Sequence, residues 1–259
     1  MRNLQSAIFL VSITLLLSLS TSVEAAESSK VFSPTKEAAM IAMTNRAAKN
    51  ERDPFLSYLL LDRFEISDQS NNPVSWDATA WLGRDNHKLY FKSEGETTSG
   101  NTDSQNRLLY SHPVAPFWDV QLGLDYDQTD EYKNQTWATV GLQGLAPYFF
   151  ETDIYLLANN DNVGIRFDGD IDFLLTQRLI LTPRMGFEAY TQNQSRYGLG
   201  SGLSSTDIGV RLRYEFSRNF APYLGIKWQN TYGSTEDFVK QNGGKSSDTS
   251  LVAGLRVWF

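Results

Sequence analysis

Two pairs of side chains in this sequence, one of histidines and one of methionines, are of types that bind a soft metal ion. His87 opens one predicted strand, and His112 lies near the end of the next predicted strand. Antiparallel pairing would place positions 87–89 opposite 112–114, so both imidazoles would lie at one rim of a sheet. Met40 and Met43 stand three residues apart on a predicted helix and share a face. Imidazole and thioether groups are ligands for Cu(I), so the pattern predicts a copper site at this rim.

Other interpretations of these four residues stay open. A histidine at the rim of a membrane protein is also an ordinary interfacial residue. Strand parity decides whether His87 and His112 point to one face or to opposite faces. Met40 and Met43 would equally suit the apolar face of a helix that packs against the rest of the protein.

Catalytic motifs are missing from the sequence. Ser111 and His112 are adjacent, and adjacent strand residues point to opposite faces, so they cannot act together as nucleophile and base. The many acidic residues are expected to form ion pairs with Arg and Lys instead of catalytic dyads. No phosphate-binding loop, HExxH motif or calcium loop occurs. We therefore expect a protein that is not an enzyme.

The composition narrows the class of partner. The chain has 23 Lys and Arg against 30 Asp and Glu, a formal net charge of -7, which argues against nucleic acid. It has no cysteine, which excludes disulfides, thiolate metal sites and a cysteine nucleophile. Aromatic residues make up 13% of the chain, which fits the aromatic girdles of a protein whose partner is membrane lipid.

Two segments precede the predicted strands. Residues 1–25 combine Arg2, an apolar core at 7–17 and small residues before Ala25, which is the pattern of a cleaved signal peptide. Residues 26–54 are expected to form a periplasmic segment with a short helix, in which Ser33 is the N-cap and Pro34 the first helical residue. No later apolar run is long enough for a membrane helix.

Residues 55–259 carry the period-two alternation of β-strands. In the last stretch, 249–259, every second residue from Phe259 back to Leu251 is apolar, and the intervening set includes Arg256. A terminal aromatic residue in such a strand is typical of outer-membrane β-barrels. The same division into an apolar and a charged face recurs in 118–126, 163–173 and 207–216.

The alternation predicts an all-β protein, a transmembrane antiparallel up-and-down β-barrel in the outer membrane of a Gram-negative bacterium. Short connections alternate with long ones, as expected for periplasmic turns and extracellular loops. Merging one weak hairpin would give ten strands instead of twelve. The twelve expected strands cover 56–66, 74–84, 87–95, 106–114, 117–126, 135–145, 149–158, 162–175, 178–190, 205–217, 220–231 and 249–259.

The charged faces are expected to line the interior of the barrel as ion pairs. Asp62 and Arg63 are adjacent and cannot both point inward, so we expect one of them at a bulge or near a rim. Whether the bore is open or filled does not follow from the sequence, because side chains can fill a barrel of this size. The expected wall residues are Asp119, Asp125, Glu151, Asp153, Asp168, Asp170, Asp172, Glu188 and Asp207, with Lys88, Lys92, Arg166, Arg184, Arg211, Arg213 and Arg256.

Several stretches of the predicted barrel resemble the copper resistance protein B family. Among them are SWDATAWLGRDNHKLYFKSEGE (75–96), LLYSHPVAPFWDVQLGLDYD (108–127), GLGSGLSSTDIGVRLRYEFSRNFAPYLGIKW (198–228) and DTSLVAGLRVWF (248–259). The resemblance covers residues 58–259 in order and spacing.

This resemblance implies an outer-membrane barrel that contributes to copper tolerance. It also implies a periplasmic multicopper oxidase as partner, with copper bound or passed across the membrane. Family members commonly carry a long segment rich in Met and His before the barrel, whereas this chain has only Met40 and Met43 there and no His before His87. A passive small-solute channel, or a structural barrel without a copper role, is the alternative.

Overall fold

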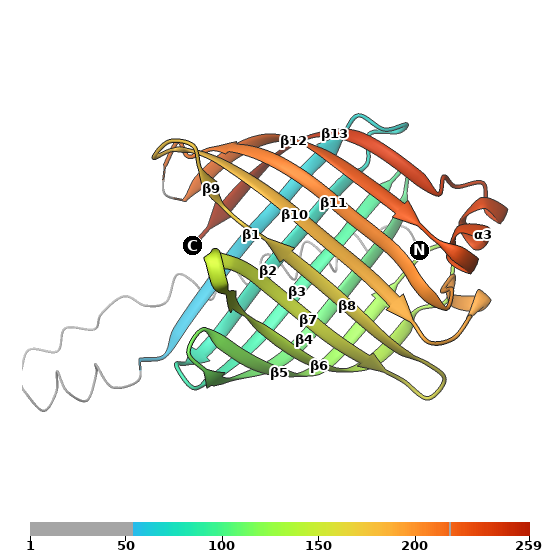
Figure 1. Ribbon diagram of the computed structural model, residues 1–259, viewed down its shortest axis with the longest axis horizontal. Coiled ribbons are helices and arrows are strands. Elements are labelled where there is room, and N and C mark those ends of the chain that lie inside the picture. The colour runs from blue at the N-terminus through green and yellow to red at the C-terminus, as the bar shows by residue number, and fades with distance from the viewer. Residues whose placement is uncertain (1–53, 218) are drawn as a thin grey trace, which may run out of the picture. The chain divides into compact units, whose positions relative to one another are not determined.

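The computed structural model describes residues 54–217 and 219–259. The predicted signal peptide at 1–25, the helix predicted within 26–54, and Met40 and Met43 therefore lie outside the described residues. No helix in the described part of the chain has the length and apolarity needed to cross a membrane. The described residues form a long series of strands with one α-helix and two short 3-10 helices (Figure 1).

The strands follow one another along the chain with few interruptions. Their bounds are β1 Leu56–Ser67, β2 Val74–Arg84, β3 His87–Thr98, β4 Asn101–Ala115, β5 Trp118–Gln128, β6 Gln135–Ala146, β7 Phe150–Ala158, β8 Val163–Asp170, β9 Phe173–Leu174, β10 Leu179–Tyr190, β11 Gly202–Tyr214, β12 Phe220–Thr231 and β13 Ser247–Trp258. The helices are η1 Pro147–Phe149, η2 Ser195–Tyr197 and α3 Gly233–Gln241.

The sheet closes on itself as an antiparallel barrel. Each strand pairs with its neighbours along the chain, and β1 pairs with β13 through partners such as Leu60 and Trp258. The short β9 and the longer β8 both pair with β10, so they are two pieces of one broken strand. The barrel therefore has twelve strands, and the prediction of twelve is confirmed.

Several predicted segments differ from the structure, among them the strand 205–217, which is observed as Gly202–Tyr214. The expected loop at 96–105 is mostly strand, because β3 and β4 continue to a tight turn at Ser99 and Gly100, both with positive φ. The expected strand 162–175 is interrupted after Asp170. The expected polar loop at 232–248 contains helix α3.

The two faces of the barrel follow the predicted alternation. On β11, Ile208 and Leu212 point outward and are 45% and 41% exposed, whereas Arg211 and Arg213 point inward and are buried. An apolar outer surface suits lipid, and the backbone of a closed barrel leaves no unpaired edge within it. Inside, one wall carries an aromatic cluster of Tyr90, Leu109, Trp137, Tyr155, Leu157 and Tyr190.

The predicted irregularity in β1 is a bulge. Leu61 pairs with Val257 and Phe64 pairs with Leu255, so Asp62 and Arg63 together stand opposite one residue of β13. The expectation that the two side chains cannot both point inward was wrong, because the bulge turns both to the interior. Asp62 pairs with Arg256 at 2.9 Å, and Arg63 pairs with Asp77 at 2.9 Å.

Glycine on one strand makes room for a tyrosine ring from the next at three interior positions, one of which pairs Gly164 with Tyr190. A Cβ on Gly141 would lie 2.6 Å from the ring of Tyr155, and a Cβ on Gly254 would lie 2.6 Å from the hydroxyl oxygen of Tyr223. The rings lie flat on the wall there, and each hydroxyl reaches a charged side chain: Tyr155 contacts Lys92, and Tyr223 donates to Glu65.

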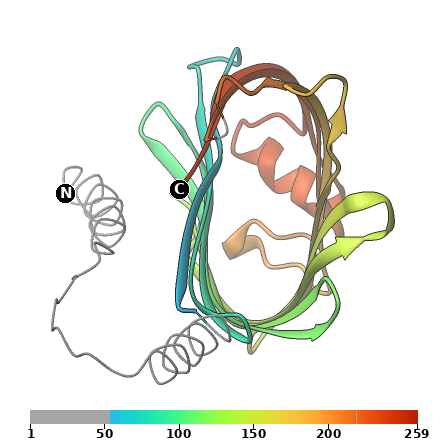
Figure 2. The ribbon, with the colours of Figure 1, turned by 90° about the vertical axis from the view of Figure 1, so that its left-hand side faces the viewer.

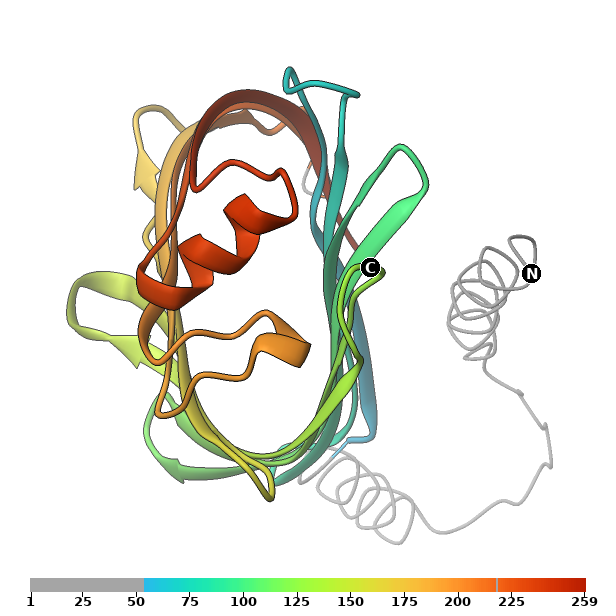
Figure 3. The same cartoon turned by 90° about the vertical axis from the view of Figure 1, so that its right-hand side faces the viewer.

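Two loops fold across the end of the barrel opposite the chain terminus, as Figures 2 and 3 show in views along the axis. The loop around η2 meets α3 where Gly200 donates its backbone N–H to Thr235, whose hydroxyl also contacts Ser204. Asn242, which follows α3, donates to the Tyr132 hydroxyl of a third loop. Through these contacts the loops partly cover the extracellular mouth.

On the surface of α3, a hydrogen bond from Lys240 lowers the pKa of Glu236.

Candidate functional site

Arg166 of β8 is the centre of a buried ion-pair cluster in the interior. Its guanidinium lies 2.6 Å from Asp125, 2.7 Å from Asp127 and 3.0 Å from Glu188. Arg107 lies 2.9 Å from the same oxygen of Asp125 that Arg166 contacts, and Asp125 is fully buried. Charges this far from water need partners, and the cluster supplies them from strands β4, β5, β8 and β10.

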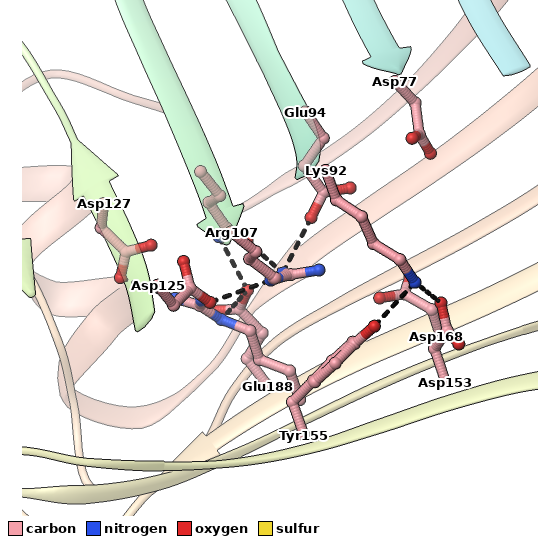
Figure 4. A network of polar contacts seen from close by, with 12 residues as sticks. Asp77, Lys92, Glu94, Arg107, Asp125, Asp127, Asp153, Tyr155, Asp168 and Glu188 are labelled. Carbon is pink, nitrogen blue, oxygen red and sulfur yellow. Dashed lines mark hydrogen bonds and ion pairs between the residues drawn. The ribbon is translucent and has the colours of Figure 1, made fainter. Parts of the chain in front are cut away.

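Lys92 of β3 forms a second buried cluster that reaches across the interior. Its ammonium lies 2.6 Å from Asp153 and 2.7 Å from the Tyr155 hydroxyl, both on β7. Tyr155 in turn donates to Gln121 at 3.0 Å. Figure 4 shows this cluster beside that of Arg107 and Asp125. The contacts join walls that lie four strands apart in the sheet.

A third group spans the middle of the interior, and we call it the midlumen layer: Arg63, Asp77, Glu94, Asp168 and Arg184. Arg184 lies 3.1 Å from Asp77, 2.9 Å from Asp168 and 4.0 Å from Glu94. Arg63 shares Asp77 and Glu94 at 2.9 Å and 3.6 Å. Each of the two guanidinium groups is therefore held by at least two carboxylates.

Two cavities lie inside the barrel, one on each side of this layer. The periplasmic cavity has a volume of about 430 Å³ and is bordered by residues near the barrel ends of the chain, such as Tyr58 and Arg256. The extracellular cavity has a volume of about 790 Å³ and extends to the loops, including Val239 and Lys245. Both are bordered by Glu94, Gln105, Asp168 and Arg184. The midlumen layer thus lies where the two cavities meet.

The two histidines lie side by side at the periplasmic rim. Lys88 pairs with Ser111, which puts His87 directly opposite His112, and the two ring centroids are 5.4 Å apart at an interplanar angle of 28°. The prediction that they share this rim is confirmed. Both side chains belong to the outward set of their strands, with Leu89 and Tyr110, and so face away from the interior.

The hydrogen bonds of the two rings leave the same atom free on each. Nδ1 of His112 lies 2.7 Å from the carbonyl oxygen of Asn86, and Nδ1 of His87 contacts the hydroxyl of Tyr110. Neither Nε2 has a hydrogen-bond partner within the described ranges 54–217 and 219–259. Nδ1 of His112 donates to a carbonyl, and a histidine that donates through one ring nitrogen and presents the other is the usual arrangement of a metal ligand.

The structure gives no complete metal site in the part of the chain that it describes. No group of three or more His, Asp and Glu side chains there is arranged to hold an ion. The predicted thioether ligands Met40 and Met43 lie outside the described residues, so the four-residue site stays a prediction. What the structure adds is the pairing of His87 with His112.

All sixteen wall residues expected from the alternation either form an ion pair in the interior or border a cavity. The sequence reasoning missed several partners that complete the clusters. Glu94 lies two residues beyond Lys92, and Asp127 lies two residues beyond Asp125, so alternation alone could have found these two. The other missed residues have no expected wall residue two positions away. The missed residues are Glu65, Asp77, Glu94, Glu96, Arg107, Asp127 and Lys227.

Comparisons with known proteins agree on the kind of protein. The family described as "Copper resistance protein B precursor" matches residues 55–259. Copper resistance protein B of Escherichia coli is 42% identical over 212 residues, covering 80% of this chain and 71% of that protein. A copper resistance protein B homolog of Pseudomonas syringae pv. tomato is 38% identical over 208 residues, covering 78% of this chain and 70% of that one. Among solved structures, the NanC porin shares the fold at a TM-score of 0.50 and 15% identity, covering 77% of this chain and 98% of that chain.

Proposed function

This chain belongs to the copper resistance protein B family, and from that premise we propose that it binds copper at its periplasmic rim. Its role in copper resistance and its place in the outer membrane follow from the family and the barrel. The observation that carries the proposed site is the pairing of His87 with His112, each with a free Nε2. The proposed cargo is Cu(I), for which imidazole and thioether are suitable ligands.

Binding one ion between the two imidazoles requires a small movement. Metal–nitrogen bonds are about 2 Å long, so two nitrogens that share an ion lie within about 4 Å of each other. The ring centroids of His87 and His112 are 5.4 Å apart, so a small rotation of the rings is enough to bring one nitrogen of each to a shared ion. Both rings are exposed, and their Nδ1 partners, Asn86 and Tyr110, lie at the rim where such a rotation meets little packing.

Two nitrogens leave a copper ion open to further ligands. We propose that Met40 and Met43 supply thioethers from the segment that precedes the barrel. That segment leads into β1, which begins at the same end of the barrel as β3 and His87. The four ligands together would give copper a mixed nitrogen and sulfur site, the kind that favours Cu(I) over the harder divalent ions.

We also propose a periplasmic multicopper oxidase as partner, which receives or delivers the ion at this rim. The exposure of both histidines supports this role, because a copper site on the outer side of the rim can be reached without entering the barrel. A direct test is exchange of Cu(I) between the loaded barrel and such an oxidase in detergent. When His87 and His112 are both replaced by Gln, transfer of Cu(I) should be slower. Its rate should then depend only on the concentration of free copper.

The proposed site is tested by Cu(I) titration of the purified protein in detergent against a competing chelator. We expect binding of one equivalent, lost in the double variant H87Q/H112Q and weakened in M40L/M43L. The matched control is M185L, because Met185 is an exposed methionine on the outer face of β10, away from the rim. Equal binding in the wild type and H87Q/H112Q would rule out the histidine pair, and equal binding in M40L/M43L would remove only the thioethers.

Copper tolerance of the host gives an independent measurement. Cells that carry H87Q/H112Q with normal barrel levels should tolerate less copper than cells with the wild type. Unchanged tolerance in cells whose variant has lost copper binding would favour the other candidate, a barrel without a copper role.

A further inference from the structure

The interior is divided at the midlumen layer, and one side chain makes the division. Arg184 on β10 contacts Asp77 on β2 and approaches Glu94 on β3. In the closed order of strands, β2 lies five positions from β10 through the β1–β13 junction, and β3 lies six positions away, half of the twelve. The guanidinium therefore reaches from one wall to the opposite wall of the barrel.

The crossing is held from both sides. Asp168, beside Arg184 on the near wall, accepts from one guanidinium nitrogen at 2.9 Å, and Asp77, on the far wall, accepts from the other at 3.1 Å. Arg63 contacts Asp77 as well, and Glu94 lies between Arg63 and Arg107. Charged hydrogen bonds of this length in a shielded interior are among the stronger polar contacts.

We propose that Arg184 closes the bore between the two cavities and that its release makes the barrel a cation pathway. The argument is independent of copper, because it concerns the bore and not the rim. Arg184 and Asp168 border both cavities, so breaking their contact with the far wall joins the spaces of about 430 Å³ and 790 Å³.

The charge of the two cavities decides which ions would use the joined bore. Seven acidic and four basic side chains border the periplasmic cavity, and eight acidic and six basic side chains border the extracellular one. An excess of one sign in a narrow space raises the local concentration of the opposite ion. Glu151 and Asp170, cross-strand partners that border the periplasmic cavity, form no ion pair within the described residues. A cation that enters can compete with the guanidinium for the carboxylates of the midlumen layer.

The test is the conductance of the purified full-length protein in planar lipid bilayers in potassium chloride. The wild type should stay nearly closed, and R184A should raise the steady conductance roughly tenfold or more. In a salt gradient, the reversal potential of R184A should have the sign of cation preference. R184K keeps the charge but loses the two-pronged contact, so it should conduct at an intermediate level.

The matched control is R213A. Arg213 is also a buried interior arginine, but it pairs with Asp172 and borders neither cavity, so its loss should leave the conductance at the wild-type level. Folding of each variant is verified by the heat-dependent shift of the barrel on gel electrophoresis. The proposal would be overturned if the wild type and R184A had equal conductance. It would also be overturned if folded R184A and folded R184K both failed to conduct. Anion preference of R184A would overturn the assignment of a cation pathway.

Discussion

Glu65 and Arg211 form the interior ion pair best suited to a quantitative test, because the pair is isolated and deeply buried. Arg211 donates through Nε and a terminal nitrogen to the two carboxylate oxygens of Glu65 at 3.0 Å and 2.9 Å. Tyr223 donates a third hydrogen bond to Glu65 at 3.1 Å. Glu65 is 2% exposed and Arg211 is 6% exposed, so water cannot replace either partner.

Removal of one partner leaves the other charge buried without compensation. We expect E65A and R211A each to lower the free energy of unfolding by about 3–5 kcal/mol. The double variant E65A/R211A leaves no orphan charge, so its loss should be smaller than the sum of the single losses by about 2–3 kcal/mol. Y223F removes one charge-assisted hydrogen bond and should cost about 1.5–3 kcal/mol.

The measurement is reversible urea unfolding of the barrel in lipid vesicles, followed by tryptophan fluorescence. The internal control is the pair of Arg196 and Asp161, which has a similar distance of 3.0 Å but side chains 56% and 58% exposed. Breaking it should cost no more than about 1 kcal/mol, because water screens it. Additive losses in E65A/R211A, or a cost for R196A equal to that of R211A, would refute the reasoning from burial.

Three further variants test the packing and the ion pairs of the interior. G141V should lower the free energy of unfolding by about 1–3 kcal/mol, because the new side chain meets the Tyr155 ring. The control is T139V, at a buried hydroxyl with no hydrogen-bond partner in the described residues. This variant should leave the free energy of unfolding unchanged in the same assay. R166Q should destabilise by more than about 3 kcal/mol, because three carboxylates lose their shared cation, and a loss below that of R196A would contradict the cluster.

Local sequence patterns predicted those features of the barrel that depend on neighbours along the chain. Period-two alternation assigned Arg211 and Arg213 to the interior, because each side chain's face follows from its own strand. The approximate facing of His87 and His112 followed from one predicted hairpin, although a loop was expected at 96–105 where the structure has a tight turn. Their outward direction could also be read from the sequence, since His87 lies on the same strand face as the apolar Leu89 and Phe91.

Contacts across the bore were not predictable in the same way. Arg184 and Asp77 are 107 residues apart, and their meeting depends on how far each strand is shifted against the next around the closed barrel. The strand ends at 96–105 were misread because polar residues such as Glu96 and Asp103 continue the ladder where a loop composition is expected. Helix α3 was missed because its sequence, GSTEDFVKQ, has few apolar residues and begins with glycine.

The bulge in β1 also determines where this chain can gain or lose a residue. Leu61 and Phe64 both face outward although they are three positions apart, so one residue of the Asp62–Arg63 pair is additional to the regular alternation. Deleting one of the two would leave the remaining residues of the strand on their present faces, whereas a deletion elsewhere in β1 would turn part of the strand inside out. The second charge here is Arg63, which contacts Asp77 and Glu94 in the midlumen layer. A single inserted codon at this position is therefore enough to add a cation to the interior of such a barrel without disturbing its outer face.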